Sequence, residues 1–147
     1  MWLLVSIVEL ISLLGVGILA GSSLYITLVE IPARAEIEAR DKLVNWQSVF
    51  PKAMNVLKTS GLAMLPFLAL AALLSFHIGW LIALLILFAL GPFTAQKIAP
   101  TNEVLMALND EATAEEIDDL IAAWGRLHNI RTVLTTVAFL CVALAVV

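Results

Sequence analysis

The chain has one cysteine, Cys141, and only two histidines among its 147 residues, and these small numbers exclude several kinds of chemistry. A single cysteine cannot form an intramolecular disulfide, a CxxC redox pair or a cysteine-based zinc site. Neither histidine has the sequence spacing of a recognisable metal site, such as ExxH. Because His77 and His128 fall in segments expected at opposite membrane surfaces, they cannot share one haem iron. We therefore expect no metal and no bound cofactor.

Charge is also scarce, at 14% of the residues, whereas 62% of the residues are apolar. Soluble domains contain about 25% charged and about 45–50% apolar residues. The apolar residues form four long blocks rather than the stripes of amphipathic helices, which indicates that lipid surrounds most of the surface. No basic tract suggests binding to nucleic acid, so we exclude that class of partner.

Each apolar block approaches the about 20 helical residues that cross about 30 Å of hydrocarbon. We expect a single domain over residues 1–147, with spans at about 2–31, 54–76, 78–98 and 126–147. The link between the second and third spans is so short that these two helices must be antiparallel neighbours. The predicted fold is an all-α, transmembrane, up-down-up-down four-helix bundle with a short amphipathic helix in each of the two longer connections. Pro32 should end or kink the first helix near Ile31, and Thr113 with Glu116 forms a capping box that should start the helix leading into the fourth span.

The basic residues are distributed unevenly along the chain. All eight lie in or beside the first and third connections: Arg34, Arg40, Lys42, Lys52, Lys58, Lys97, Arg126 and Arg131. Lys and Arg are retained on the cytoplasmic side during membrane insertion. We therefore expect both long connections in the cytoplasm, both termini outside, and a location in the cell inner (plasma) membrane.

Trp124, His128 and Arg131 are spaced i, i+4 and i+7, which places them on one face of a helix. Apolar residues of the preceding turns extend this face, so His128 and Arg131 should point into the protein. A histidine there can exchange a proton, and an arginine can hold an anionic oxygen in fixed geometry. The alternative is structural, with Arg131 reaching lipid phosphate, His128 bonding a carbonyl and Trp124 belonging to the interfacial aromatic belt.

Three further residues are candidates near the inner ends of the spans. Glu30 is either a site carboxylate or the ion-pair partner of Arg34, one turn away. Asn102 is either part of a helix start or a group that reaches the His128 side of the interface. Tyr25 is the only tyrosine and follows a GxxxG motif at Gly17 and Gly21, which permits close helix approach and would also leave room for a flat ligand.

Three segments together resemble the anthrone oxygenase-like family of small four-helix membrane proteins. They are Val-Glu-Ile-Pro at 29–32, Ile-Ala-Pro-Thr-Asn-Glu at 98–103 and Trp-Gly-Arg-Leu-His-Asn-Ile-Arg at 124–131. Most members have no assigned function, and some fungal members are associated with oxidation of anthrones to anthraquinones without a tightly bound metal or flavin. The resemblance therefore implies cofactor-independent oxygenase chemistry on a flat aromatic molecule.

In that chemistry His128 would be the base and Arg131 would stabilise the enolate. Trp124, Asn102, Tyr25 and Glu30 would surround the substrate, at the inner ends of the first, third and fourth spans. Expected partners are membrane lipid, an aromatic small molecule or quinone, and further copies or a larger membrane complex. The alternative function is a non-catalytic accessory subunit or a small transporter of the inner membrane.

Overall fold

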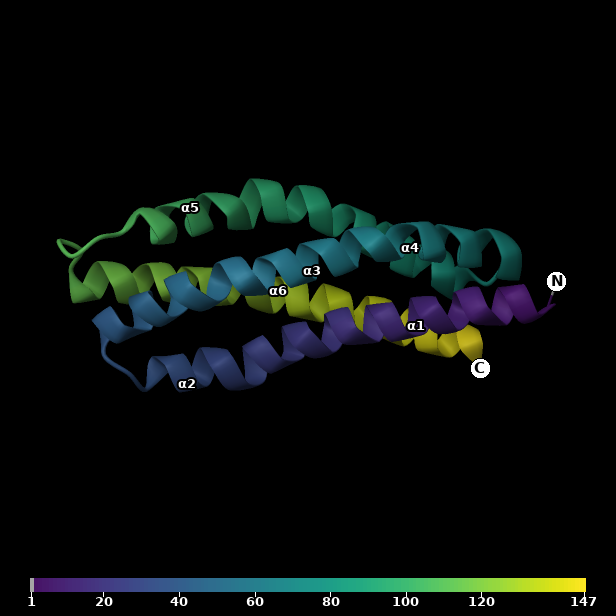
Figure 1. Cartoon of the computed structure of the whole chain (residues 1–147), viewed down its shortest axis with the longest axis horizontal. Helices are drawn as coiled ribbons and strands as arrows, with labels where there is room; N and C mark the ends of the chain where they lie inside the picture. Colours follow the sequence, from purple (N-terminus) through teal and green to yellow (C-terminus); the bar gives the residue numbers. More distant parts are fainter. Residues whose placement is uncertain (1) are drawn as a thin grey trace.

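The computed structural model describes residues 2–147, which are almost entirely helical and contain no strand. Four long rods run side by side (Figure 1). Their helical elements, in chain order, are α1 (Trp2–Tyr25), the π-helical turn η1 (Ile26–Glu30), α2 (Ile31–Ala35), α3 (Ala39–Ser75), α4 (Ile78–Phe93), the π-helical turn η2 (Thr94–Ile98), α5 (Ala99–Ala107) and α6 (Ala114–Val146). The all-α fold predicted from the sequence is confirmed.

All four rods are long and apolar enough to cross a membrane: Trp2–Ala35, Ala39–Ser75, Ile78–Ala107 and Ala114–Val146. Large apolar side chains cover their outer surfaces, including Leu14, Ile18, Phe88 and Leu144, which are more than half exposed. A surface of this kind is stable in lipid and costly in water. The chain is therefore a multi-pass membrane protein.

The direction of the rods alternates along the chain. The start of α1 and the end of α6 lie with the α3–α4 turn at one end of the molecule, and the two longer connections lie at the other (Figure 1). Helix α1 packs against α3 and α6, and α4 packs against the same two helices. Fully buried small and branched residues fill the centre, among them Val16, Leu68, Ala83 and Ala138.

The polar helical segments expected in the longer connections are continuous with the spans that follow them. Helix α3 begins at Ala39, well before the apolar block, and α6 begins at Ala114. The predicted cap of α6 is confirmed, since Thr113 Oγ1 accepts a hydrogen bond of 3.2 Å from the Glu116 amide. Each of these helices therefore carries polar side chains on the same rod as its apolar span.

Pro32 was expected to end or kink the first helix near Ile31, and the first rod does not end there. It continues to Ala35, and the π-helical turn η1 lies directly before α2, in which Pro32 occupies the first turn. The third rod repeats this order, with η2 directly before α5 and Pro100 in its first turn. In both rods the amide directly before the proline bonds back to the first carbonyl of the π turn, from Ile31 to Ile26 and from Ala99 to Thr94. The proline itself has no amide hydrogen to donate, and the π turn accommodates it within a continuous rod.

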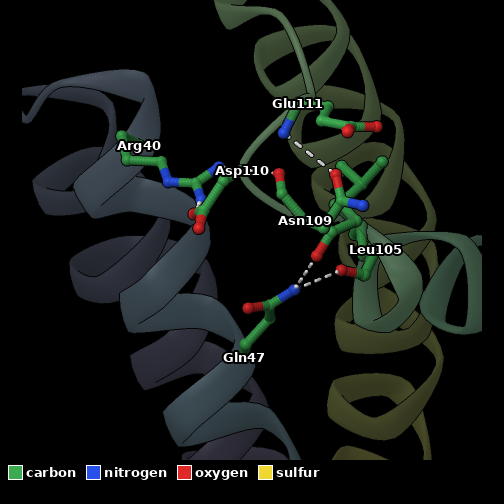
Figure 2. Close-up of polar contacts among 7 residues, drawn as sticks. Arg40, Gln47, Leu105, Asn109, Asp110 and Glu111 are labelled. Carbon is green, nitrogen blue, oxygen red and sulfur yellow. Dashed lines mark hydrogen bonds and ion pairs between the residues drawn. The ribbon is translucent and has the colours of Figure 1, made fainter.

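The connection between α5 and α6 is tied to the polar part of α3 (Figure 2). Gln47 Nε2 donates to the carbonyl oxygens of Leu105 and Leu108, at 2.9 and 3.1 Å. Arg40 donates to the Asn109 carbonyl at 2.7 Å and forms an ion pair with Asp110. These contacts fix the start of α3 beside the end of α5 and so hold the middle of α3 close to α6.

The closest approach of a glycine to the backbone of another helix lies away from the predicted GxxxG motif. A Cβ atom on Gly17 would lie 3.2 Å from the Phe139 ring, but one on Gly21 would meet no atom of residues 2–147 within 4 Å. At Gly79, by contrast, a Cβ atom would collide with the backbone carbonyl of Cys141. The close approach of two helices therefore occurs between the start of α4 and the end of α6.

Candidate functional site

One face of α6 carries three buried side chains that could take part in chemistry. Trp124, His128 and Arg131 are 5%, 4% and 8% exposed, respectively. Their spacing predicted a common inward face, and all three line the same cavity. Burial of a guanidinium and an imidazole side by side is uncommon in a protein interior, so this face is the starting point for the site.

The cavity is small and is enclosed by the first, second and fourth rods. Its volume is about 20 Å³, room for about one water molecule. We expected the site between the first, third and fourth spans, but α3 supplies the wall instead of the third rod. The reason is that α3 starts early and runs past the His128 face, where Trp46, Phe50 and Met54 line the cavity.

His128 is held by a ring stack on one side and by backbone oxygen on the other. Its ring stacks on the Trp124 ring, with 5.2 Å between centroids and 19° between planes. Its Nε2 atom lies 3.4 Å from the Ser23 carbonyl oxygen of α1. Thr132 Oγ1, one turn further along α6, donates to the same carbonyl at 3.2 Å and lies 2.8 Å from Thr27 Oγ1. The imidazole thus sits at a polar seam between α1 and α6.

Aromatic rings of α3 and α6 form part of the cavity wall. Trp46 stacks on Phe50 with 4.4 Å between ring centroids, and the Trp124 ring meets Trp46 edge to face at 5.8 Å. Such offset and edge-to-face contacts are favourable arrangements of aromatic rings. The Trp46 indole nitrogen is buried and has no hydrogen-bond partner within residues 2–147. The wall therefore combines flat apolar surface with an unsatisfied donor.

Two guanidinium groups face the cavity. Arg131 Nη1 lies 3.8 Å from the Met54 sulfur, a weak acceptor. Arg34 lies over the Trp124 ring, with 5.8 Å between its Cζ atom and the ring centroid. Its Nη2 is 3.3 Å from Glu30 Oε2. The ion-pair interpretation of Glu30 is therefore confirmed, and Glu30 also lines the cavity.

A wider groove adjoins the cavity between α2 and α3. It measures about 310 Å³ and is lined by Ala33, Ile37, Asn45 and Val49, together with Glu30 and Arg34. Glu30, Arg34 and Val49 also line the inner cavity. The Arg34 side chain, held by Asn45 through a 3.0 Å bond from Nε to Oδ1, thus stands between the groove and the His128 cavity.

The structure does not bring two of the predicted site residues to this cavity. Tyr25 is 55% exposed on the outer surface of the first rod, and the neighbouring Ile26 lines the cavity in its place. Asn102 is buried in α5, where its Oδ1 has no hydrogen-bond partner in the described part of the chain. It belongs to the third rod, which does not form the cavity wall.

Arg34 and Trp46 are the main site residues that the sequence did not reveal. Arg34 opens a run of alternating acidic and basic residues, and the sequence indicates it as a partner of Glu30 and as one of the basic residues that set the orientation, not as a site residue. Trp46 lies in the polar segment before the second apolar block, outside the predicted span. The available signal was the spacing of Leu43, Trp46 and Phe50 at i, i+3 and i+7, which marks a packed helical face.

Metal-binding side chains do not cluster within residues 2–147, where no group of three His, Cys, Asp or Glu residues could hold an ion. His77 lies in the α3–α4 turn, and its Nδ1 accepts a hydrogen bond of 3.1 Å from the Gly79 amide. His77 therefore caps the start of α4, and it is not among the residues that line the His128 cavity.

The comparison with known families gives a match that covers most of the cavity-forming segments. The model of the family described as anthrone oxygenase matches residues 46–141, which is more than half of the chain. The matched segment begins at Trp46 and includes Met54, Trp124, His128 and Arg131, so α3 and α6 contribute their parts of the cavity wall from within it. No curated protein and no solved structure matches the chain.

Proposed function

Because this chain belongs to the anthrone oxygenase family, we propose that it binds a flat, hydrophobic aromatic molecule and oxidises it with dioxygen. The observation that carries the proposal is the pairing of buried His128 and Arg131 on one cavity whose wall includes Trp46, Phe50 and Trp124. An apolar, flat wall suits an aromatic ring system, and the two polar groups suit proton removal and anion stabilisation.

The reaction converts a ring CH₂ flanked by two aromatic rings into a carbonyl. His128 accepts one proton from this carbon, and Arg131 stabilises the resulting enolate oxygen by its positive charge. The enolate carbon then bonds to dioxygen and takes up a proton to give a hydroperoxide. Loss of water breaks the O–O bond and removes the second C–H hydrogen as a proton, leaving the carbonyl. One oxygen atom enters the product and the other leaves in water, so no additional reductant is required.

A three-ring molecule is larger than the 20 Å³ cavity, so binding requires the wall to open. Met54 lines the cavity beside Arg131, and methionine side chains are flexible and adapt readily to bound ligands. Movement of Met54 and Arg34 would join the cavity to the 310 Å³ groove. The combined space between α2, α3 and α6 is the proposed substrate site.

Purified full-length protein in detergent tests the proposal with anthrone as the substrate. Oxygen consumption and anthraquinone absorbance are followed for the wild type and for His128→Ala, Arg131→Ala and Arg126→Ala. Removal of the base should lower turnover about 10²-fold or more, and removal of Arg131 should lower it by a similar factor. Arg126 is exposed on the same helix, so its replacement should leave turnover unchanged.

The accessory-subunit or transporter function predicts a different result. The closed, nearly filled cavity is the observation that favours it. In that case the wild type would oxidise no anthrone and would copurify stoichiometrically with a larger membrane complex, which native mass spectrometry would detect. Turnover that depends on His128 would contradict this alternative. The same spectra would show whether lipid, quinone or further copies of the chain are retained.

We also propose that the two longer connections face the cytoplasm, because all eight basic residues lie in or beside them. A cysteine-free background, Cys141→Ala, allows single cysteines to be placed at Asp110 and Phe76. Phe76 lies in the α3–α4 turn and is 90% exposed. In intact cells a membrane-impermeant maleimide should label Phe76→Cys and not Asp110→Cys. Labelling of Asp110→Cys alone would reverse the orientation.

A further inference from the structure

Two arginines share a buried cavity with a single carboxylate. Arg34 and Arg131 are 6% and 8% exposed, and both line the same cavity as Glu30. With His128 neutral, two positive side chains and one negative side chain leave one net positive charge there. A buried charge without a counter-charge is costly, and more so beside a hydrocarbon phase.

The donors of these two groups are only partly used within residues 2–147. Arg34 Nη1 is buried without a hydrogen-bond partner, although Nε and Nη2 of the same group bind Asn45 and Glu30. Arg131 Nη1 donates a hydrogen bond to the Met54 sulfur, which is a poor acceptor. Unsatisfied buried guanidinium donors lose hydrogen bonds that an oxygen anion would supply.

We infer that Arg34 and Arg131 bind one monoanionic oxygen group, a carboxylate or phenolate, on the hydrophobic molecule that occupies this site. A single negative charge matches the net charge of the cavity, whereas a phosphate dianion would exceed it. The inference rests on the proposed function for the location of the site. It adds an acidic substituent to the substrate class and makes Arg34 a binding residue that discriminates between ligands by charge.

The position of Arg34 explains how this residue would discriminate between ligands by their charge. Arg34 is the arginine that lines both the 310 Å³ groove and the inner cavity. A ligand that passes from the groove to His128 therefore meets Arg34 first. Glu30 opposes binding of an anion because its carboxylate already occupies Arg34 Nη2 at 3.3 Å. Replacing Glu30 with an amide should free this donor and strengthen anion binding.

Matched probes test the inference without turnover. Full-length protein in phosphatidylcholine nanodiscs is dialysed against anthracene-2-carboxylate or the neutral anthracene-2-carboxamide at pH 8, with protein-free nanodiscs as the blank. The wild type should bind the carboxylate about tenfold tighter or more, the range of a charge-assisted hydrogen bond. Arg34→Gln and Arg131→Gln should each remove the preference, and Arg126→Gln should retain it.

Two further variants keep the test decisive if Arg34→Gln does not fold. Arg34→Lys preserves the charge and should retain a preference for the carboxylate, and Glu30→Gln should increase it severalfold. Equal affinities of the wild type for the two probes would overturn the inference, as would a preference that no change at Arg34, Arg131 or Glu30 alters.

A phospholipid phosphodiester is a second source of the same single charge. Nanodiscs containing phosphatidylglycerol distinguish the sources: displacement of the carboxylate that disappears in Arg34→Gln would identify a lipid headgroup as the native anion. Absence of displacement would assign the site to a free acidic aromatic molecule. Both results support an anion site. Anthrone turnover without charge preference would contradict this inference alone, and charge preference without turnover would contradict the proposed function alone.

Discussion

The Trp124 and His128 rings stack nearly parallel on adjacent turns of α6, with 5.2 Å between their centroids. The stack fixes the orientation of the imidazole plane, and the Ser23 carbonyl oxygen lies 3.4 Å from the Nε2 atom of His128. Because both contacts come from rigid helices, the histidine cannot rotate freely in the cavity. The indole therefore controls the direction in which His128 meets any bound molecule.

Two replacements of Trp124 should distinguish its contribution to packing, which affects stability, from its effect on the orientation of the His128 ring, which affects turnover. Trp124→Ala removes a buried aromatic side chain and should lower the free energy of unfolding by about 3–5 kcal/mol. Trp124→Phe keeps a flat ring beside His128 and should cost less while retaining most of the turnover. Denaturant titration in detergent micelles checks the stabilities. Equal losses of stability and of turnover in the two variants would show that stacking on His128 has no importance beyond packing.

Hydrogen bonding at the seam between α1 and α6 leads to a second prediction. Thr132 Oγ1 donates to the Ser23 carbonyl at 3.2 Å and lies 2.8 Å from Thr27 Oγ1. Thr132→Val should lower the free energy of unfolding by about 0.5–1.5 kcal/mol. Thr27→Val in the same background should then cost less than it does in the wild type, because the two hydroxyls share one bond. Strictly additive losses would contradict the shared bond.

The contact between α4 and α6 makes Gly79 sensitive to any side chain. A Cβ atom there would collide with the Cys141 backbone carbonyl, which cannot move without shifting α6. Gly79→Ala should therefore lower the free energy of unfolding by about 1–3 kcal/mol. The control is Gly61→Ala in α3, where a Cβ atom meets nothing of residues 2–147 within 4 Å. Alanine there should be neutral or stabilise by up to about 1 kcal/mol.

Gln47 should determine how firmly the α5–α6 connection is held. Its amide donates to the Leu105 and Leu108 carbonyls, which lie at the end of α5 (Figure 2). Gln47→Met has a similar shape and lacks both bonds, so amide hydrogen exchange over residues 105–113 should accelerate severalfold. Gln96→Met, at an exposed position in η2, should leave that exchange unchanged. Unchanged exchange in Gln47→Met would contradict the anchoring role.

The sequence predicted those features that depend on local physics. Crossing hydrocarbon requires a minimum helical length, so the four apolar blocks revealed the spans. The spacing of Trp124, His128 and Arg131 predicted their common face because an α-helix has a fixed period. The Thr113 cap was predictable for the same reason: it depends on residues three positions apart.

The neighbours of that face were not predictable from local pattern. Which rod covers His128 depends on the early start of α3 and on contacts such as Gln47 with Leu105, which join segments far apart in sequence. The π-helical turn η1 adds a second difficulty, because a π turn closes i to i+5 and interrupts the α-helical period. Tyr25 lies before this turn, on the same outward face of α1 as the exposed Gly21, so Ile26 lines the cavity wall instead.

The length of α3 determines where the cavity lies relative to the bilayer. Its 37 residues extend about 55 Å at 1.5 Å per residue, whereas the hydrocarbon layer is about 30 Å thick. Its apolar end lies at the Ser75 turn, so the half that begins at Ala39 must protrude among the headgroups and into water. The wall formed by Trp46 and Phe50 belongs to this half. An amphiphile can therefore approach the cavity along the bilayer boundary, with its ionised end in water until it meets Arg34 and its rings never crossing the membrane.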